Sequence, residues 1–285
     1  MNTVDIKNVF VLGGGTMGLD IAQVLARSGR NVCVFNTTAE SSAKAQLRMD
    51  KTLEKLLTKG KIAEEEKFEI ECRISYTVSP DDAADADLVI EAAAEKMDLK
   101  LSLFEKLDGI CRPETILATN TSSLSITQIA SATNRPEKVI GMHFFNPATI
   151  MKLVELIRGE KTDDETFAVV KELCEEIGKT AVEIQEAPGF VVNRLLIPMI
   201  NEAAEVLNTG VASAEDVDAA MQLGANHPMG PLHLGDLIGL DVCVAIMDTL
   251  AMETGDPKYR CSPLLRKLVR AGKLGRKSGQ GFFTY

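Results

Sequence analysis

Residues 8–18 read NVFVLGGGTMG, and residues 19–29, which follow directly, read LDIAQVLARSG. The opening apolar residues have the character of a short buried strand, and the second stretch has apolar residues at helical spacing. Between them lies the pattern G-x-G-x-x-G. A strand, a glycine-rich turn and a helix in this order are typical of the first unit of a dinucleotide-binding fold. The stretch therefore predicts a dinucleotide site.

The three glycines of this pattern have separate expected roles. Gly13 permits the tight turn, Gly15 lets a pyrophosphate approach the backbone, and Gly18 lets the helix pack closely on the sheet. The next predicted strand, residues 31–35, ends at Asn36, where an acidic residue usually binds the adenosine ribose. No carboxylate is present to repel a 2′-phosphate, and no arginine follows immediately to attract one. The choice between NAD and NADP stays open at this point.

Strand-like and helix-like stretches continue to alternate along the first part of the chain. Further strands are expected at residues 85–93, 114–120, 138–144 and 151–157, and helices at 40–59 and 163–177. The inner side of the helix at 40–59 is expected to carry Leu47, Leu53, Leu56 and Leu57. This alternation predicts an α/β domain over residues 1–186, with a Rossmann-type, doubly wound, mostly parallel sheet.

The second part of the chain has helix-like stretches in place of the alternating strands and helices. Pro188 and Gly189 mark a joint, and helices are expected at 189–208 (kinked or interrupted by Pro198), 213–223, 236–253 and 262–271. The stretch 227–241 is expected to be a loop that enters an apolar helix. These features predict an all-α domain over residues 187–285. Its apolar helices indicate a homodimer or a higher homo-oligomer, the alternative being a bundle packed within one chain.

Composition limits the partners and the location of the protein. A net charge of −10 provides no basic excess for phosphate backbones, which argues against nucleic-acid binding. The six cysteines include no CxxC pair, so we expect neither a zinc site nor any other bound metal. We find no apolar signal region at the N-terminus and no run of membrane-spanning length, so we expect a cytoplasmic protein with no membrane partner.

Residues 139–157, VIGMHFFNPATIMKLVELI, place one ionisable residue in each of two apolar runs. A carboxylate in a dry strand is costly unless it is paired, and His143 is a natural partner for Glu155. Such a pair leaves the second ring nitrogen facing a substrate. The alternative is two ordinary strands with one satisfied core histidine and one glutamate at a strand edge.

Taken together, these motifs resemble those of the 3-hydroxyacyl-CoA dehydrogenases along essentially the whole chain. The matching stretches are VLGGGTMG (11–18), ATNTSSLSIT (118–127), GMHFFNPATIMKLVE (141–155), PGFVVNRLL (188–196), NHPMGPLHLGDLIGLD (226–241) and GRKSGQGFF (275–283). The middle stretches are far more specific than the glycine pattern. The resemblance implies an oxidoreductase that interconverts short-chain (S)-3-hydroxyacyl-CoA, such as 3-hydroxybutyryl-CoA, and 3-oxoacyl-CoA with NAD(P).

The same resemblance implies residue roles. His143 would act as general base toward the C3 hydroxyl, and Glu155 would orient the imidazole and stabilise its charged form. Ser122 and Asn193 would hydrogen-bond the reacting and thioester oxygens. A helix cap at Ser122 and a polar contact at a helix joint for Asn193 are the structural alternatives.

Ligand contacts are implied in the same way. The residues expected to contact the dinucleotide are Gly13, Gly15, Gly18, Asn36, Glu95, Lys100, Ser122, Asn146 and Lys277. Thr52 and Lys59, seven residues apart on one helix, would bind the CoA moiety of the acyl-CoA substrate. A solvated lysine face is the alternative for this helix, which also carries Lys51 and Lys55. Asn36 departs from the family pattern, so NADP stays possible beside NAD.

Two further functions share these features. One is a dehydrogenase of the same architecture that acts on a sugar acid. The other is a catalytically idle dinucleotide-binding protein with a structural role. Activity with acetoacetyl-CoA but not with gulonate would separate the first from the acyl-CoA enzyme, and any turnover would exclude the second.

Overall fold

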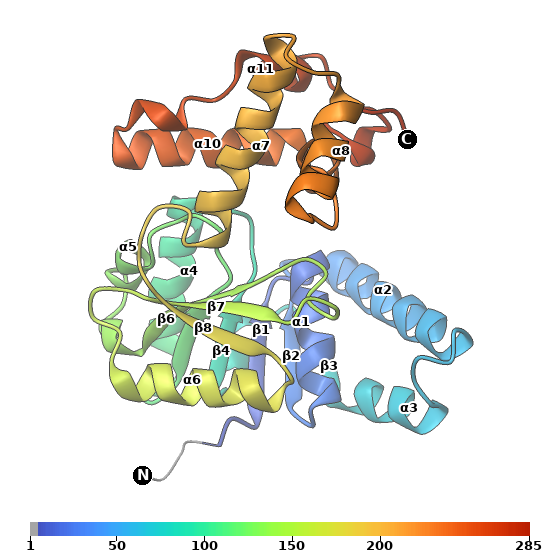
Figure 1. The fold of residues 1–285 in the computed structure, drawn as a ribbon. Coiled ribbons are helices and arrows are strands. Elements are labelled where there is room, and N and C mark those ends of the chain that lie inside the picture. Colours follow the sequence, from blue (N-terminus) through green and yellow to red (C-terminus); the bar gives the residue numbers. More distant parts are fainter. Residues whose placement is uncertain (1–4) are drawn as a thin grey trace. The chain divides into compact units, whose positions relative to one another are not determined.

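The computed structural model describes residues 5–285, and the chain divides into two compact units at Glu186 and Ala187. The first unit contains the sheet and the second is helical (Figure 1). Each unit has its own buried apolar cluster.

Within residues 5–186 one sheet of eight strands forms, in the order β3-β2-β1-β4-β5-β6-β7-β8. The strands are β1 (Asn8–Leu12), β2 (Asn31–Phe35), β3 (Ile74–Thr77), β4 (Leu88–Glu91), β5 (Ile116–Thr119), β6 (Val139–Phe144), β7 (Leu153–Arg158) and β8 (Thr180–Gln185). In this unit β6 and β7 form the one antiparallel pair, and every other neighbouring pair is parallel. The prediction of a doubly wound, mostly parallel sheet is therefore confirmed.

Helices cover both faces of this sheet (Figure 1). They are α1 (Thr16–Arg27), α2 (Ala39–Thr58), α3 (Glu64–Arg73), α4 (Met97–Ile110), α5 (Ile126–Ala130) and α6 (Asp164–Glu176). Alternate strand residues such as Val9 and Val11 pack into one core with α1, α2 and α6. On the other face lie α4 and α5, with Phe104 and Ile126 fully buried. Burial on both faces explains why the central strands read as continuous apolar runs.

The strand β6 is buried along its whole length. Gly141 lets α5 and β7 approach it, because a Cβ at this position would lie 2.9 Å from Ile126 Cδ1 and 2.9 Å from Ile157 Cβ. His143 therefore follows two residues after a point of very close packing, in a strand with little room to shift. This rigidity fixes the position of the histidine at the carboxyl end of the strand.

The helical unit begins with a long helix that contains a proline. Its helices are α7 (Val192–Asn208), α8 (Ala214–Ala225), α9 (Pro231–Ile238), α10 (Leu240–Thr254) and α11 (Pro263–Arg270). Pro198 lies inside α7, which continues through it, so of the two expected outcomes the interruption does not occur and the kink stays a prediction. Packing stabilises α7 on both sides of the proline, because Ile197 and Ile200 are fully buried in one apolar cluster with residues of α10.

Some elements differ from those expected. The stretch 227–241 is not a plain loop, because α9 begins with Pro231 at its first turn and Gly239, at φ +106°, separates it from α10. Leu47 was expected on the inner side of α2 but is 53% exposed, whereas Leu53 is fully buried. The difference follows from the rotation of α2, whose buried positions are Ala45, Met49 and Leu53.

Across residues 5–285, none of the helices combines the length and the apolar character needed to cross a bilayer.

Candidate active site

The strands β6 and β7 place His143 and Glu155 directly opposite each other in the antiparallel register. Nδ1 of His143 lies 2.8 Å from Oε2 of Glu155, and the two side chains are 8% and 1% exposed. The ring of Phe145 packs against the imidazole at 4.6 Å between centroids. A buried carboxylate that holds Nδ1–H fixes the tautomer and the orientation of the ring.

The neighbouring strand end is tied to this pair. Asn120, which follows β5, accepts a hydrogen bond from the backbone N–H of Phe144 through Oδ1 at 2.8 Å. Because β5 and β6 are adjacent and parallel, their carboxyl ends lie at the same edge of the sheet. The polar turn after β5 is thus fixed beside the histidine.

Glu95 holds the turn that carries Ser122. Its Oε1 accepts hydrogen bonds from the Thr121 hydroxyl at 2.6 Å, the Ser122 N–H at 2.7 Å and the Ser122 hydroxyl at 3.0 Å. Burial alone would raise the pKa of the Glu95 carboxyl, but Lys100 and these hydrogen bonds lower it below its usual value. Glu95 therefore acts on Ser122 as an anionic acceptor. Its expected contact with the dinucleotide stays a prediction.

Lys100 is fully buried beneath this turn. Its Nζ lies 2.7 Å from both carboxylate oxygens of Glu91 and 3.4 Å from Oε2 of Glu95. Glu91 also accepts from the Thr119 hydroxyl at 2.7 Å. The ammonium thus already has carboxylate partners, and its expected contact with the dinucleotide stays a prediction. The sequence reasoning did not single out Glu91, although an acidic residue at the end of the apolar run LVIE was a usable signal.

The glycine loop between β1 and α1 has the expected shape. Gly13 adopts φ +117°, and a Cβ on Gly18 would lie 1.8 Å from the carbonyl oxygen of Gly13. A Cβ on Gly15, in contrast, would meet no atom within 4 Å, so the loop is open where a pyrophosphate would approach. Gly15 is also the N-cap of α1. This cradle fits a dinucleotide phosphate at a helix N-terminus.

Two residues outside the predicted set hold the loop after β6. Asp20 of α1 accepts a hydrogen bond from the Ala148 N–H at 3.0 Å, and burial raises the pKa of its carboxyl. Lys179 donates to the carbonyl oxygens of Ala148 at 2.6 Å and Met151 at 2.8 Å. This loop includes Asn146, whose side chain is exposed. An acidic residue among the apolar positions of α1 was the signal that could have identified Asp20.

The other predicted ligand residues lie farther along the chain. Thr52 donates its hydroxyl to the carbonyl oxygen of Arg48 one turn earlier in α2 at 2.8 Å, and Lys59 is the exposed C-cap of that helix. Asn193 lies in the first turn of α7, in the helical unit. Lys277 belongs to the same unit and pairs with Asp241 at 2.5 Å. The roles of these residues stay predictions.

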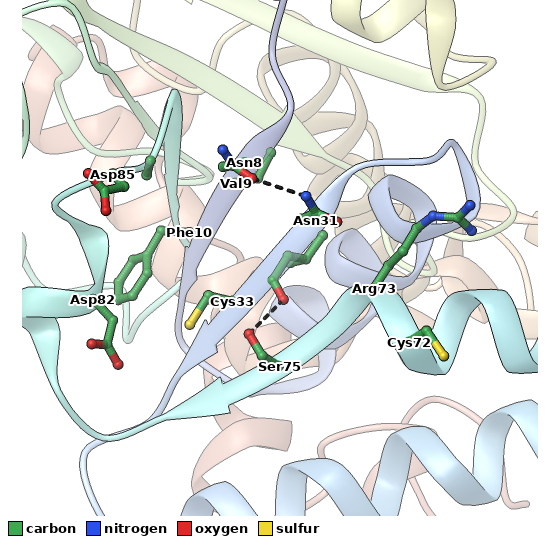
Figure 2. A pocket seen from close by; sticks show the side chains of 12 residues that line it. Asn8, Val9, Phe10, Asn31, Cys33, Cys72, Arg73, Ser75, Asp82 and Asp85 are labelled. Atoms are coloured by element: carbon green, nitrogen blue, oxygen red, sulfur yellow. Dashed lines mark hydrogen bonds between the residues drawn. The ribbon is translucent and has the colours of Figure 1, made fainter.

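A separate hollow opens on the sheet face that carries Phe10, Cys33 and Ser75 (Figure 2). Asn8 and Asn31, at the amino ends of β1 and β2, also line it. Ligands of such sheets gather at the carboxyl ends of strands, so this hollow lies at the wrong end for the dinucleotide. Among the described residues, none of those predicted to bind the dinucleotide or the substrate lines this hollow.

Comparison with known proteins covers both units. Residues 8–187 match the NAD binding domain of 3-hydroxyacyl-CoA dehydrogenase, and residues 189–285 match the C-terminal domain of the same family. The chain is 56% identical to the 3-hydroxybutyryl-CoA dehydrogenase of Clostridioides difficile, over 96% of this chain and 98% of that protein. It is 52% identical to a probable 3-hydroxybutyryl-CoA dehydrogenase of Bacillus subtilis, over 99% and 98% of the two chains.

Solved structures agree with these relatives. The crystal structure of (S)-3-hydroxybutyryl-CoA dehydrogenase from Ralstonia eutropha matches with a TM-score of 0.95 at 47% identity, covering 99% of each chain. That of FadB2 from Mycobacterium tuberculosis matches with a TM-score of 0.97 at 41% identity, covering 99% of this chain and all of the other. Both the fold and the order of the two units are thus shared with proteins of known structure.

Proposed function

The chain belongs to the 3-hydroxyacyl-CoA dehydrogenase family, and we propose that it interconverts short-chain (S)-3-hydroxyacyl-CoA and 3-oxoacyl-CoA with NAD(P). The substrate pair with the best support is 3-hydroxybutyryl-CoA and acetoacetyl-CoA, since these relatives are named for it. The observation that carries the proposal is the buried His143–Glu155 pair at the carboxyl edge of the sheet. This pair supplies the proton chemistry that oxidation of an alcohol requires.

In the oxidative direction, the C3 hydroxyl of the substrate loses a proton and its C3 carbon loses a hydride. Nε2 of His143 takes the proton, while Glu155 holds Nδ1–H and stabilises the imidazolium that forms. The nicotinamide ring supplies the hydride acceptor when the dinucleotide is bound. In the reductive direction the imidazolium returns the proton to the C3 oxygen.

Ser122 and Asn193 are proposed to hydrogen-bond the reacting and thioester oxygens. The contact between Glu95 and Ser122 supports the first role, because the carboxylate holds both the backbone and the hydroxyl of Ser122 in one orientation. To donate to a developing oxyanion, the hydroxyl turns its single proton from Glu95 to that oxygen, while the backbone N–H of Ser122 keeps the residue in place. Asn193 enters the proposal through the family motif PGFVVNRLL alone.

The dinucleotide is proposed to lie along the glycine loop, with its phosphates at the N-terminus of α1. Gly13, Gly15 and Gly18 make this approach possible, and Asn146 and Lys277 are further proposed contacts. Asn36 stands where a carboxylate would exclude a 2′-phosphate, so we propose weaker discrimination between NAD and NADP than in relatives with an acid there. Thr52 and Lys59 on the α2 segment are proposed to bind the CoA moiety.

The direct test is the rate at which acetoacetyl-CoA oxidises the reduced dinucleotide, followed by absorbance. We expect turnover with acetoacetyl-CoA and none with gulonate under the same conditions. Turnover of gulonate alone would replace the proposal with a sugar-acid dehydrogenase. A folded protein that binds the dinucleotide and turns over neither substrate would indicate a structural role.

The helical unit is proposed to form a homodimer or a higher homo-oligomer and to close over the substrate, and the protein is proposed to act in the cytoplasm. Large apolar side chains exposed on three of its helices support the first idea, namely Leu195 at 70%, Leu223 at 88% and Met252 at 75%. Light scattering that gives the mass of a single chain at micromolar concentration would contradict it.

A further inference from the structure

The carboxyl end of β2, the glycine loop and α2 meet around Gly14. A Cβ on this glycine would lie 2.3 Å from Oδ1 of Asn36 and 2.9 Å from Cβ of Ala45. The three segments are therefore in direct contact at the place where the adenosine ribose of a dinucleotide lies in folds of this type. What recognises the ribose in this protein must come from side chains around this point.

Arg48 reaches this point from the third turn of α2. Its guanidinium donates a hydrogen bond to the carbonyl oxygen of Gly14 at 2.7 Å, although the residue as a whole is exposed. Among the described residues, no carboxylate forms an ion pair with it. An arginine has five N–H donors in a planar fork, so most of them remain for an anion. The sequence has no arginine directly after β2, but α2 folds back so that Arg48, farther along the chain, reaches the glycine loop.

Asn36 adds a second, independent observation. The residue is 7% exposed, and its Nδ2 is a buried donor without a hydrogen-bond partner. A buried donor without a partner is destabilising, so an acceptor supplied by a ligand would stabilise this side chain. A half-turn of the amide exchanges its oxygen and nitrogen, so either group can face a ligand. An amide can therefore accept from a ribose hydroxyl or donate to a phosphate, whereas a carboxylate can only accept.

The surroundings favour an anion. Exposed Thr37 and Thr38 separate Asn36 from α2, and the helix begins with its N-terminus at this place. The nearest acid along the chain, Glu40, is paired with Lys44 at 2.6 Å on the surface of the helix. The positive end of the helix dipole, the guanidinium of Arg48 and the unpaired amide donor of Asn36 thus lie around one short stretch of chain.

We infer that Arg48 and Asn36 form the recognition site for the 2′-phosphate of NADP(H), with Arg48 as the residue that determines cofactor specificity. The inference rests on the proposed function only in that the site belongs to the same dinucleotide. Arg48 keeps its hydrogen bond to Gly14 with one N–H and binds the phosphate with the others. Asn36 donates its amide to the same phosphate.

The first experiment needs no catalysis. Calorimetric titration of the full-length protein with 2′,5′-ADP and with 5′-AMP isolates the contribution of the 2′-phosphate, since the two probes differ by that group alone. We expect the wild-type protein to bind 2′,5′-ADP at least about tenfold more tightly, the value of one charge-assisted contact. Equal affinities for the two probes would overturn the inference without any variant.

Variants then assign the effect to Arg48. Arg48→Gln should abolish the advantage of 2′,5′-ADP while affinity for 5′-AMP changes little, and Arg48→Lys should retain part of it because the charge remains. The matched control is Arg73→Gln, which removes a half-buried arginine that pairs with Glu69 on α3. An equal loss of both probes in Arg48→Gln would mean that Arg48 supports the glycine loop or the adenine, which contradicts the inference.

Kinetics with acetoacetyl-CoA complete the test. Arg48→Gln should lower kcat/KM for NADPH by about 10- to 100-fold relative to that for NADH. Binding of 2′,5′-ADP through Arg48 without any reduction of acetoacetyl-CoA would overturn the proposed function and leave this inference standing. Reduction of acetoacetyl-CoA with NADH, together with equal affinities for 2′,5′-ADP and 5′-AMP, would overturn this inference and leave the proposed function standing.

Discussion

Within residues 5–285 each unit contains one histidine bonded through Nδ1 to a buried carboxylate, and the two pairs differ in everything else. His143 and Glu155 face each other across two strands at the carboxyl edge of the sheet, and both are buried. His233 lies in the first turn of α9 and is 39% exposed, 2.5 Å from Oδ2 of Asp218 on α8.

The surroundings of Asp218 show what the second pair does. Asp218 also accepts the backbone N–H groups of Leu232 at 2.8 Å and His233 at 2.9 Å, and so satisfies the N-terminus of α9. The ring of His233 stacks on Phe283 of the C-terminal segment at 3.6 Å between centroids. This pair connects two helices and the end of the chain. The comparison teaches that a carboxylate–histidine pair is not by itself a catalytic group, because its place in the fold decides its role.

The largest expected effect concerns His143. His143→Ala should lower kcat for acetoacetyl-CoA by about 10³- to 10⁴-fold, since proton transfer to the C3 oxygen loses its donor. The folded state should persist, which circular dichroism and a thermal melt can verify. A kcat within a factor of three of the wild-type value would remove His143 from the mechanism.

Glu155→Gln should have a smaller effect on the same assay. The amide can still accept from Nδ1–H but carries no charge to stabilise the imidazolium, so we expect kcat to fall about 100-fold with a smaller change in KM. The comparison of kcat with KM separates this role from simple disruption of the site. A change in KM alone would mean that Glu155 serves binding rather than proton transfer.

Asp218→Asn probes the second pair. The amide cannot accept from three donors at once and presents its own N–H₂ to one of them, so the free energy of unfolding should fall by about 2 to 3 kcal/mol. A thermal melt measures the effect, and kcat per folded molecule should stay close to the wild-type value. A loss of kcat as large as that of Glu155→Gln, with an unchanged melting temperature, would contradict the structural role that we assign to the pair of His233 and Asp218.

His233→Ala is expected to have the smallest effect. The ring is partly exposed, and its removal leaves Asp218 with both backbone donors, so we expect a loss of about 1 kcal/mol of stability. Turnover of acetoacetyl-CoA should be unchanged. This variant is the matched control for His143→Ala, because both remove an imidazole from a carboxylate, and equal losses of turnover would refute the contrast.

Much of this molecule follows from local patterns. The strand, glycine turn and helix at residues 8–29 are specified by apolar periodicity and by glycines that only a tight turn requires. Pro231 was a usable signal for the start of α9, but a loop was predicted for the whole of residues 227–241. The edge strand β8, TAVEIQ, was not singled out because most of its residues are exposed and it lacks an apolar run.

The residues of the candidate site also differ in how far local sequence patterns could identify them. An imidazole and a carboxylate in two dry strands can be paired from sequence, since antiparallel neighbours bring opposite residues together. The sequence offered a signal for Asp20 but not for its partner, and none for Arg48, because both contacts join residues far apart in the chain and depend on how α1 and α2 are rotated against the sheet. Such contacts become visible only when tertiary packing fixes the rotation of a helix.

The most direct test of the account is a crystal structure of the protein with the dinucleotide and acetoacetyl-CoA bound together. We predict that Nε2 of His143 lies within hydrogen-bonding reach of the C3 oxygen, about 2.6 to 3.2 Å, while Nδ1 keeps its bond to Glu155. An imidazole turned away from that oxygen, with Glu155 bonded to another group, would contradict the central claim.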